Sequence, residues 1–284
     1  MTPRELRLCL PHAEVAVRLW GPDVGVPVLA LHGWLDNSAS FDRLAPLLEG
    51  LQVAAVDLPG HGRSSRLPDG CGNHFADWAA VALAIADALG WDRLSLLGHS
   101  MGAGISTLVP AAAPGRVARV VLLEGTGPMS EPAERAPASL AEALAQEARL
   151  AHQEARVFPS LQAAVAARRR DSDLDEASAR LLVERGTEAV ADGVRFTHDP
   201  RLRTRSRVRF TEEQVRAFLH AIESPVLAVR ASHGWPFPAE LVAARMAVIP
   251  DLRVVEVEGG HHVHLTHPER VADAVREFLT EAER

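Results

Sequence analysis

The sequence contains no lysine and no tyrosine, so all 30 of its basic residues are arginines. The absence of lysine excludes every mechanism that needs a Schiff-base lysine or the lysine of a phosphate-binding P-loop. The absence of tyrosine also excludes mechanisms in which a tyrosine hydroxyl acts as the acid. These common kinds of catalytic group are ruled out before any motif is considered.

Cysteine is almost as scarce. The two cysteines, Cys9 and Cys71, form neither a disulfide framework nor a metal-binding pattern, which favours a reducing, cytoplasmic setting. The 37 acidic residues outnumber the arginines and give a net charge of −7, which argues against nucleic acid or an anionic membrane as a partner. No uncharged apolar run approaches the roughly 18 residues of a membrane span, and the N-terminus carries charges where a signal peptide needs an apolar core. We therefore expect a soluble protein.

What the chain does contain is a large share of hydrophobic residues, 47%, which is enough to bury a large core. Short apolar segments alternate with segments of helical periodicity. This alternation is typical of a doubly wound α/β sheet, so we expect a mostly parallel sheet with an antiparallel hairpin at one edge. The expected strands are residues 5–10, 15–19, 27–31, 53–56, 94–97, 117–123, 225–229 and 252–257, and the expected helices are residues 40–48, 75–89, the segment after 100, 239–246 and 268–281.

The alternation breaks between residues 129 and 220, where no apolar strand run occurs. Helical patterns cover three segments of this region, residues 140–151, 161–170 and 177–184. We interpret the region as a helical cap inserted into an α/β core formed by residues 1–128 and 221–284. The three consecutive arginines at 168–170 are expected to lie on a solvent-exposed helix face.

The apolar strand at 94–97 leads directly into Gly98-His99-Ser100-Met101-Gly102, and a segment able to form a helix follows. This is the Gly-x-Ser-x-Gly pattern in the strand–turn–helix context of a nucleophile elbow. The turn strains the backbone of the serine, and glycine at 98 and 102 avoids clashes beside it. Ser100 is therefore the expected nucleophile, close to the first amides of the following helix. A dinucleotide-binding fingerprint is excluded, because Ser100 occupies the place of its second glycine.

A serine nucleophile needs a histidine base, and in chain order the acid and then the histidine follow the serine of a nucleophile elbow. After the last strand the sequence reads Glu258-Gly259-Gly260-His261-His262-Val263-His264-Leu265-Thr266-His267. The glycines allow a close approach to the elbow, so His261 is the expected base, and His262 is the alternative if the register differs by one. His264 and His267 are expected at the pocket rim or at the start of a helix. No metal site is expected, because no Asp, Glu or Cys with ligand spacing accompanies the cluster.

The negative charge that develops on a reacting carbonyl oxygen needs two backbone amides, which form an oxyanion hole. One is the amide of Met101, directly after the nucleophile, and the other should come from the loop after the strand at 27–31. In that loop Gly33 lets the Trp34 amide turn inward. We also expect Trp34 and Trp235 to shape an apolar pocket for the substrate.

Together these motifs resemble the α/β-hydrolase family, and they follow its order along nearly the whole chain. They are Leu31-His32-Gly33-Trp34, Asp57-Leu58-Pro59-Gly60-His61-Gly62-Arg63-Ser64, Gly98-His99-Ser100-Met101-Gly102 and Gly260-His261. More narrowly, the chain resembles the serine-hydrolase-like branch, through Leu35-Asp36-Asn37-Ser38-Ala39-Ser40-Phe41-Asp42, Asp199-Pro200-Arg201-Leu202 and Phe210-Thr211-Glu212-Glu213-Gln214-Val215. That branch implies a hydrolase without a single defined substrate.

One departure from the family pattern concerns the acid of the triad. Many members carry an Asp a few residues past the strand at 225–229, but here no carboxylate occurs between Pro225 and Ala239. A subset of the family takes the acid from the end of the preceding strand, where this sequence has Glu124. The resemblance therefore implies Glu124 as the acid that orients His261. The alternative is that Glu124 is a buried carboxylate paired with an arginine.

We predict a serine hydrolase that cleaves a small ester-type substrate, namely a carboxylic ester, lactone or thioester, through an acyl-enzyme on Ser100 and without a cofactor or metal. The motifs specify neither the natural substrate nor an oligomeric state. Two alternatives are a carbon–carbon hydrolase on the same fold and a catalytically inactive small-molecule binding module. The binding module would be favoured if Glu124 did not meet His261. A serine nucleophile argues against the related dehalogenases and epoxide hydrolases, which use an Asp.

Overall fold

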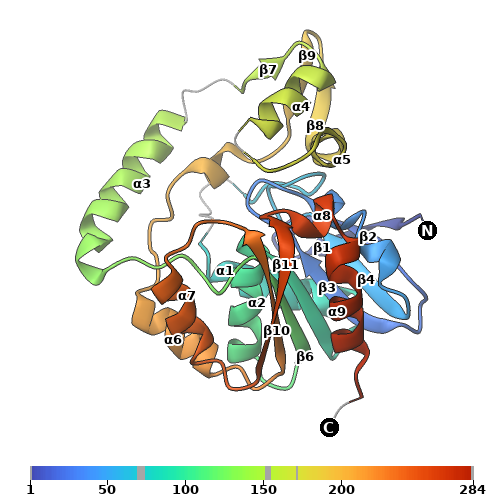
Figure 1. Cartoon of the computed structure of the whole chain (residues 1–284). Coiled ribbons are helices and arrows are strands. Elements are labelled where there is room, and N and C mark those ends of the chain that lie inside the picture. Colours follow the sequence, from blue (N-terminus) through green and yellow to red (C-terminus); the bar gives the residue numbers. More distant parts are fainter. Residues whose placement is uncertain (1, 69–73, 151–154, 171, 283–284) are drawn as a thin grey trace.

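The computed structural model describes residues 2–68, 74–150, 155–170 and 172–282, so Cys71 lies outside the described residues. The strands of the central sheet are β1 (Arg4–Leu10), β2 (Ala13–Trp20), β3 (Val26–Leu31), β4 (Leu51–Val56), β5 (Leu94–His99), β6 (Val117–Leu123), β10 (Val226–His233) and β11 (Leu252–Gly260). They form one eight-stranded sheet in the order β1-β2-β4-β3-β5-β6-β10-β11 (Figure 1). Only β2 is antiparallel to its neighbours in this sheet, and all other pairs are parallel. The predicted mostly parallel sheet with an N-terminal hairpin is confirmed.

Helices cover both faces of this sheet, which is why its central strands are mostly apolar. The α-helices are α1 (Asp77–Ala88), α2 (Met101–Ala112), α3 (Ala136–Leu150), α4 (Leu161–Arg169), α5 (Glu176–Gly186), α6 (Glu212–His220), α7 (Ala239–Met246), α8 (Val263–Thr266) and α9 (Glu269–Thr280). Residues of α1, α2 and α6 pack on one face of the sheet, and residues of α9 pack on the other. Every residue of β4 and of β5 is buried between these layers.

The described residues also form four short 3-10 helices: η1 (Ser38–Phe41), η2 (Ala45–Leu47), η3 (Ala133–Arg135) and η4 (Pro200–Arg203). The single helix predicted for residues 40–48 is wrong, because the chain forms η1 and η2 there instead. Asn37 caps η1 with its side chain, and Pro46 at the start of η2 lacks the N–H that a continuous helix needs. No described helix is both long and apolar enough to cross a membrane.

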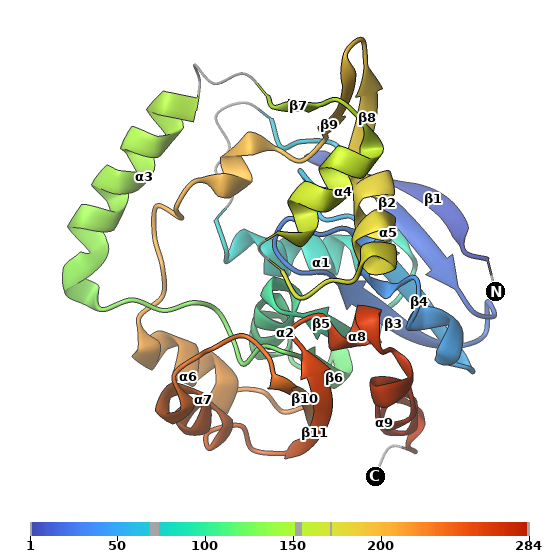
Figure 2. The same ribbon diagram turned by 45° about the horizontal axis from the view of Figure 1, so that its top comes forward.

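The segment between β6 and α6 forms a layer beyond the sheet, with α3 on one side and α4 and α5 on the other (Figure 2). It also contains three short strands, β7 (Val157–Phe158), β8 (Thr187–Val190) and β9 (Gly193–Phe196), in a small antiparallel sheet. The sequence did not predict these strands, because two to four residues are too few to show an alternating pattern. The helix predicted at 140–151 belongs to α3, and residue 151 lies outside the described residues.

The two ends of the inserted layer meet. Ser130 and Phe210 form an isolated parallel bridge, in which the Glu131 amide donates to the Phe210 carbonyl at 3.0 Å. The helix α6 that follows packs against α2, and its Val215 and Leu219 belong to the core. The predicted limits of the cap, residues 129–220, stay a proposal, and this packing favours an end near residue 210.

Candidate active site

Ser100 lies in the turn between β5 and α2, with φ of 51° and ψ of −109°. Such backbone angles are strained for a residue with a side chain, and the close packing around the turn imposes them. A Cβ atom at Gly98 would come within 2.3 Å of the Gly102 carbonyl oxygen. One at Gly102 would come within 1.9 Å of the Leu31 carbonyl oxygen. Both glycines of the motif are therefore sterically required.

Glu124 directly follows β6 and also has a positive φ, 52°. Its Oε1 accepts a hydrogen bond from the Ala231 amide at 2.6 Å, and its Oε2 accepts one from the Trp235 amide at 3.1 Å. The same Oε2 lies 3.4 Å from Nδ1 of His261. Two backbone donors thus hold the carboxylate against the expected base. Among the described residues its ion-pair partner is this histidine and not an arginine.

The loop after β10, where the family pattern has its Asp, is shaped around Glu124. A Cβ atom at Gly234 would lie 1.9 Å from Oε2 of Glu124. The carboxylate of Glu124 therefore occupies the space that any side chain at 234 would need. The position of the Glu124 carboxylate thus explains both the absence of an Asp from this loop and the presence of glycine at 234.

The amides of Trp34 and Met101 were predicted to form the oxyanion hole. Neither amide donates a hydrogen bond to another protein group within the described part of the chain. Both residues line the same cavity as Ser100. Free donors at this place fit the prediction, because an oxyanion hole needs amides that are unoccupied until the substrate binds.

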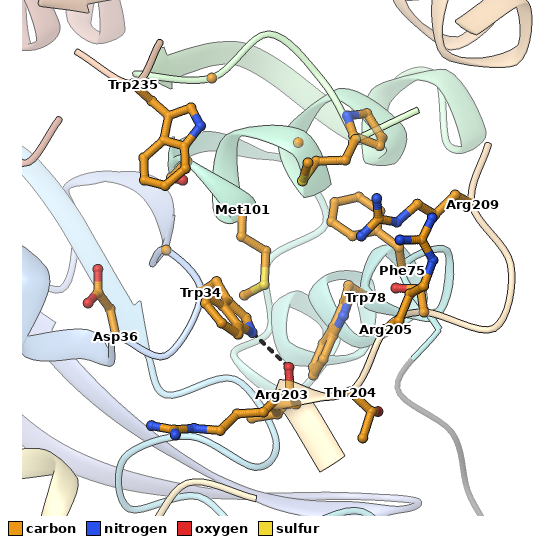
Figure 3. A pocket seen from close by; sticks show the side chains of 18 of the residues that line it. Trp34, Asp36, Phe75, Trp78, Met101, Arg203, Thr204, Arg205, Arg209 and Trp235 are labelled. Carbon is orange, nitrogen blue, oxygen red and sulfur yellow. Dashed lines mark hydrogen bonds between the residues drawn. The ribbon is translucent and has the colours of Figure 1, made fainter. Parts of the chain in front are cut away.

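A cavity of about 1670 Å³ brings the predicted site residues together. Six of those residues line it: Ser100, His261, Glu124, Trp34, Met101 and Trp235. The Trp34 indole also donates to the Leu202 carbonyl of η4 at 2.8 Å, so this residue links the core to the inserted layer (Figure 3). The Trp235 ring lies against His261, with 5.6 Å between ring centroids.

A family model described as alpha/beta hydrolase fold matches residues 26–268. The chain belongs to the α/β-hydrolase family. It is 32% identical to a serine hydrolase-like protein of Danio rerio, over 97% of this chain and 88% of that protein. It is 33% identical to a probable serine hydrolase of Drosophila melanogaster, over 98% of this chain and 88% of that protein. The resemblance to the serine-hydrolase-like branch is confirmed.

Solved structures agree with this α/β-hydrolase fold. A hypothetical protein from Pseudomonas aeruginosa PAO1 is similar with a TM-score of 0.93 and 40% identity, over 98% of this chain and 99% of that chain. The thioesterase domain from the curacin biosynthetic pathway is similar with a TM-score of 0.84 and 25% identity, over 99% of this chain and 100% of that chain. Family and relatives together support a hydrolase.

The α/β-hydrolase carries a second histidine directly after His261, in different surroundings. Nδ1 of His262 lies 2.5 Å from Oδ1 of Asp173, and its Nε2 lies 3.5 Å from Oδ2 of Asp36. Burial alone would lower the pKa of His262, but the hydrogen bonds and charges of the two carboxylates raise it to about 9. A histidine that is already protonated at neutral pH cannot accept the serine proton. This argues against His262 as the base and for His261.

Asp36 is buried, and it also pairs with the inserted layer of this hydrolase. Nη2 of Arg168, on α4, donates to Oδ1 of Asp36 at 2.6 Å. Burial would raise the pKa of Asp36, but the charge of Arg168 and the hydrogen bond from His262 hold it well below its usual value. The prediction of a solvent-exposed face at residues 168–170 is therefore wrong for Arg168, whose guanidinium reaches a buried carboxylate.

The remaining histidines of the cluster do not face the cavity. His264 lies in the first turn of α8, as predicted, but it is fully buried and not at the pocket rim. Its Nε2 is 2.8 Å from Oγ of Ser40, and burial with the charge of His262 lowers its pKa to about 3. His267 is exposed at the end of α8. Within the described residues no group of three or more His, Cys, Asp or Glu side chains is arranged to hold a metal ion.

The sequence did not predict the side of the cavity that the inserted layer forms. Five arginines of that layer line the cavity, namely Arg201, Arg203, Arg205, Arg207 and Arg209. Phe75 and Trp78 of the core line it as well. The arginines occupy every second position of the segment, which is a signal that the sequence does contain.

Proposed function

We propose that this protein is a serine hydrolase that cleaves a small carboxylic ester, lactone or thioester through an acyl-enzyme on Ser100. The observation that carries the proposal is the convergence of Ser100, in its strained turn, with His261 and Glu124 on one cavity. The names of the relatives support it, because they include serine hydrolase-like proteins and a thioesterase domain.

In the first half-reaction, Oγ of Ser100 attacks the substrate carbonyl carbon while His261 accepts the hydroxyl proton. The amides of Trp34 and Met101 bind the negative charge that develops on the carbonyl oxygen. When the tetrahedral intermediate collapses, the bond to the leaving oxygen or sulfur breaks. His261 returns the proton to that atom, so the leaving group departs as an alcohol or thiol.

In the second half-reaction, water attacks the acyl-enzyme and His261 takes one of its protons. The bond to Oγ breaks, the carboxylic acid leaves, and Ser100 regains its proton from His261. One ester and one water thus give one acid and one alcohol. Glu124, fixed by two backbone amides, stabilises the imidazolium in both half-reactions and keeps the proton on Nδ1.

A fluorophosphonate probe tests the nucleophile directly. We expect covalent labelling at Ser100, located by mass spectrometry of the digested protein, and none in Ser100→Ala. The matched control is Ser206→Ala, because Ser206 lines the same cavity outside the elbow. Labelling that persists in Ser100→Ala and falls in Ser206→Ala would contradict the proposal.

A substrate screen separates this function from its alternatives. The inactive binding module would be favoured if Glu124 lay apart from His261, and the 3.4 Å contact between them argues against it. The screen combines p-nitrophenyl esters of graded chain length, lactones, acyl thioesters and a 1,3-diketone. We expect turnover of the esters or thioesters. Cleavage of the diketone alone would favour the carbon–carbon hydrolase.

A further inference from the structure

The alternating arginines at 201, 203, 205, 207 and 209 form an arginine wall along the cavity. Arg201 and Arg203 lie in η4, and Arg205, Arg207 and Arg209 follow in the irregular segment that runs to Phe210, where the chain returns to the core. In a protein with a net charge of −7, five cations on one wall of a cavity are a local concentration of the opposite sign.

Three of the five arginines are neutralised by carboxylates. Nη2 of Arg201 lies 2.7 Å from Oδ2 of Asp199. The Arg207 guanidinium donates two hydrogen bonds to the carboxylate of Glu147, of 2.9 and 2.6 Å. Arg205 pairs with Glu131. These pairs hold part of the wall in place, and their charges are already compensated.

Arg203 has no carboxylate partner among the described residues. Its Nε donates to Nε2 of His198 at 3.1 Å. Burial, followed by the charges of Arg203 and Arg66, lowers the pKa of His198 to about 4, so His198 is neutral at pH 7. The charge of Arg203 therefore remains uncompensated at the cavity.

Arg209 is the least satisfied cation of the wall. It is half-buried, yet it makes no hydrogen bond or ion pair with any described residue. Burial, followed by the charge of Arg205, lowers the pKa of Arg209, whereas the charge of Glu131, the partner of Arg205, raises it. Nε of Arg205 is buried without a hydrogen-bond acceptor, and it lies 3.6 Å from Oε2 of Glu142. The wall has more donors and more positive charge than the protein itself neutralises.

The surroundings of this pair suit a ligand with an apolar part and a charged end. Arg205 and Arg209 project beside Phe75 and Trp78, with Met101 between them and Trp235 (Figure 3). All of these residues line the cavity of Ser100. At about 1670 Å³, it exceeds the roughly 300–1,000 Å³ of ordinary ligand pockets, so a substrate can reach both Ser100 and the wall.

We propose that Arg209, with Arg205 beside it, binds an anionic group of the substrate, a carboxylate or a phosphate, at a distance from the bond that Ser100 attacks. Planar guanidinium groups bind such groups through paired, charge-assisted hydrogen bonds. The anion satisfies the unpaired donors of Arg209. The proposal rests on the proposed function, because it adds a substrate class to the same site.

The kinetic test uses matched pairs of substrates that differ in charge. For an anion in the acyl group, p-nitrophenyl adipate, with its free carboxylate, is compared with p-nitrophenyl methyl adipate. For an anion in the leaving group, S-butyryl-4′-phosphopantetheine is compared with S-butyrylpantetheine, which lacks only the phosphate. We expect kcat/KM for the charged member of at least one pair to exceed that for the neutral member about 10- to 100-fold, the range of hydrogen bonds to charged groups. The pair that shows the preference identifies where the anion is carried.

Variants assign that preference to the wall. Arg209→Gln should lower the charged-to-neutral ratio of kcat/KM about tenfold or more, and Arg209→Lys should retain part of it, because the charge remains. The matched control is Arg195→Gln, which removes an exposed arginine of β9 outside the cavity and should leave the ratio unchanged. A ratio near one in both pairs for the wild type, or a ratio unaffected by Arg209→Gln, overturns the proposal.

Binding without turnover separates this proposal from the proposed function. Isothermal titration calorimetry of Ser100→Ala with monomethyl adipate and with 4′-phosphopantetheine needs no nucleophile. We expect at least one of them to bind, and adding Arg209→Gln should weaken it about tenfold or more. Intact, Arg209-dependent binding with no probe labelling and no turnover in the wild type would refute only the hydrolase. Labelling and turnover with neither anion bound would refute only the anion site.

Discussion

The two sides of the cavity are built in different ways. On the core side the backbone sets the positions, through the strained turn of Ser100 and the two amides that hold Glu124. On the side of the inserted layer long charged side chains set them, as in the ion pairs of Arg205 and Arg207. Backbone geometry leaves a reacting group little freedom, whereas a wall of side chains can change one residue at a time. From this comparison we infer that the proposed reaction and the proposed selectivity belong to different parts of the chain.

The two sides meet at adjacent histidines. His261 contacts Glu124 of the core, and His262 binds Asp173 of the inserted layer. One loop therefore carries both a residue of the proposed reaction and a link that holds the layer over it. Changes on either side of this loop should have effects of different kind and size.

The largest effect should come from the core side. Ser100→Ala removes the proposed nucleophile, so turnover of an activated ester should fall by a factor on the order of 10⁶. The fold should be intact, because the backbone of the turn is set by its neighbours. Steady-state assays measure the turnover, and circular dichroism shows whether the variant is folded. Unchanged esterase activity in a folded variant would show that Ser100 is not the nucleophile, so the core side would no longer be the side of the reaction.

Glu124→Gln should have the next largest effect. It keeps the shape of the side chain but removes the charge that stabilises the imidazolium of His261, so turnover should fall by roughly 10³–10⁴. The pre-steady-state rate of p-nitrophenol release measures the loss at the acylation step. The matched control is Glu188→Gln, an exposed glutamate paired with Arg195 in the inserted layer, which should leave the rate unchanged.

Asp173→Asn should weaken the contact between His262 and the inserted layer, and it should leave the proposed reaction unaffected. The pKa of His262 is raised from 6.5 to about 9, so its pairing contributes stability that is fully present below about pH 6.5 and is lost as the pH rises through about 9. Without Asp173 the free energy of unfolding at pH 6 should fall by on the order of 1–3 kcal/mol. Its decline between pH 6.5 and 9 should also become shallower.

Urea denaturation at a series of pH values from 6 to 9.5 measures this effect. Burial lowers the pKa of the neighbouring His99 well below its usual value and that of His264 to about 3, and the pKa of Asp36 is held well below its usual value. Asp192→Asn, at an exposed turn of the inserted layer, is the control. An equal pH dependence in Asp173→Asn and wild type would show that His262 does not link the two sides.

Removal of metal ions should have no effect on turnover. Exhaustive treatment with a chelator should leave the turnover unchanged, because the histidines near the site have protein partners such as Ser40 and Asp173. Activity before and after dialysis against EDTA measures this. Loss of activity that zinc restores would make His262 and His264 ligands, and the histidine loop would belong to a metal site.

The core side was readable from the sequence because its signals are local. The elbow of Ser100 and the glycines before His261 are contiguous, and Glu124 followed from the family order and from the absence of another carboxylate. The pairs that hold the inserted layer were not readable. Arg168 meets Asp36 across 132 residues, and Asp173 meets His262 across 89. Such pairs exist only after the chain has folded.

The inserted layer was also harder to predict in its secondary structure. Its strands β7 to β9 are too short for periodicity to show, and its arginine wall has the period of a strand without being one. The core elements were predicted closely because burial between two helical layers gives long apolar runs. The exception, residues 40–48, failed at Pro46, whose effect on a helix is local and could have been used.

Gly234 and Glu124 compete for the same space. A side chain at 234 would displace the carboxylate of Glu124, because its Cβ atom would lie 1.9 Å from Oε2. Adding Asp at 234 while Glu124 is present should therefore disturb the contact between Glu124 and His261. The double change Glu124→Gly with Gly234→Asp should recover activity that Glu124→Gly alone has lost. The two positions are thus alternatives for one carboxylate, and the glycine at 234 is the counterpart of the glutamate at 124.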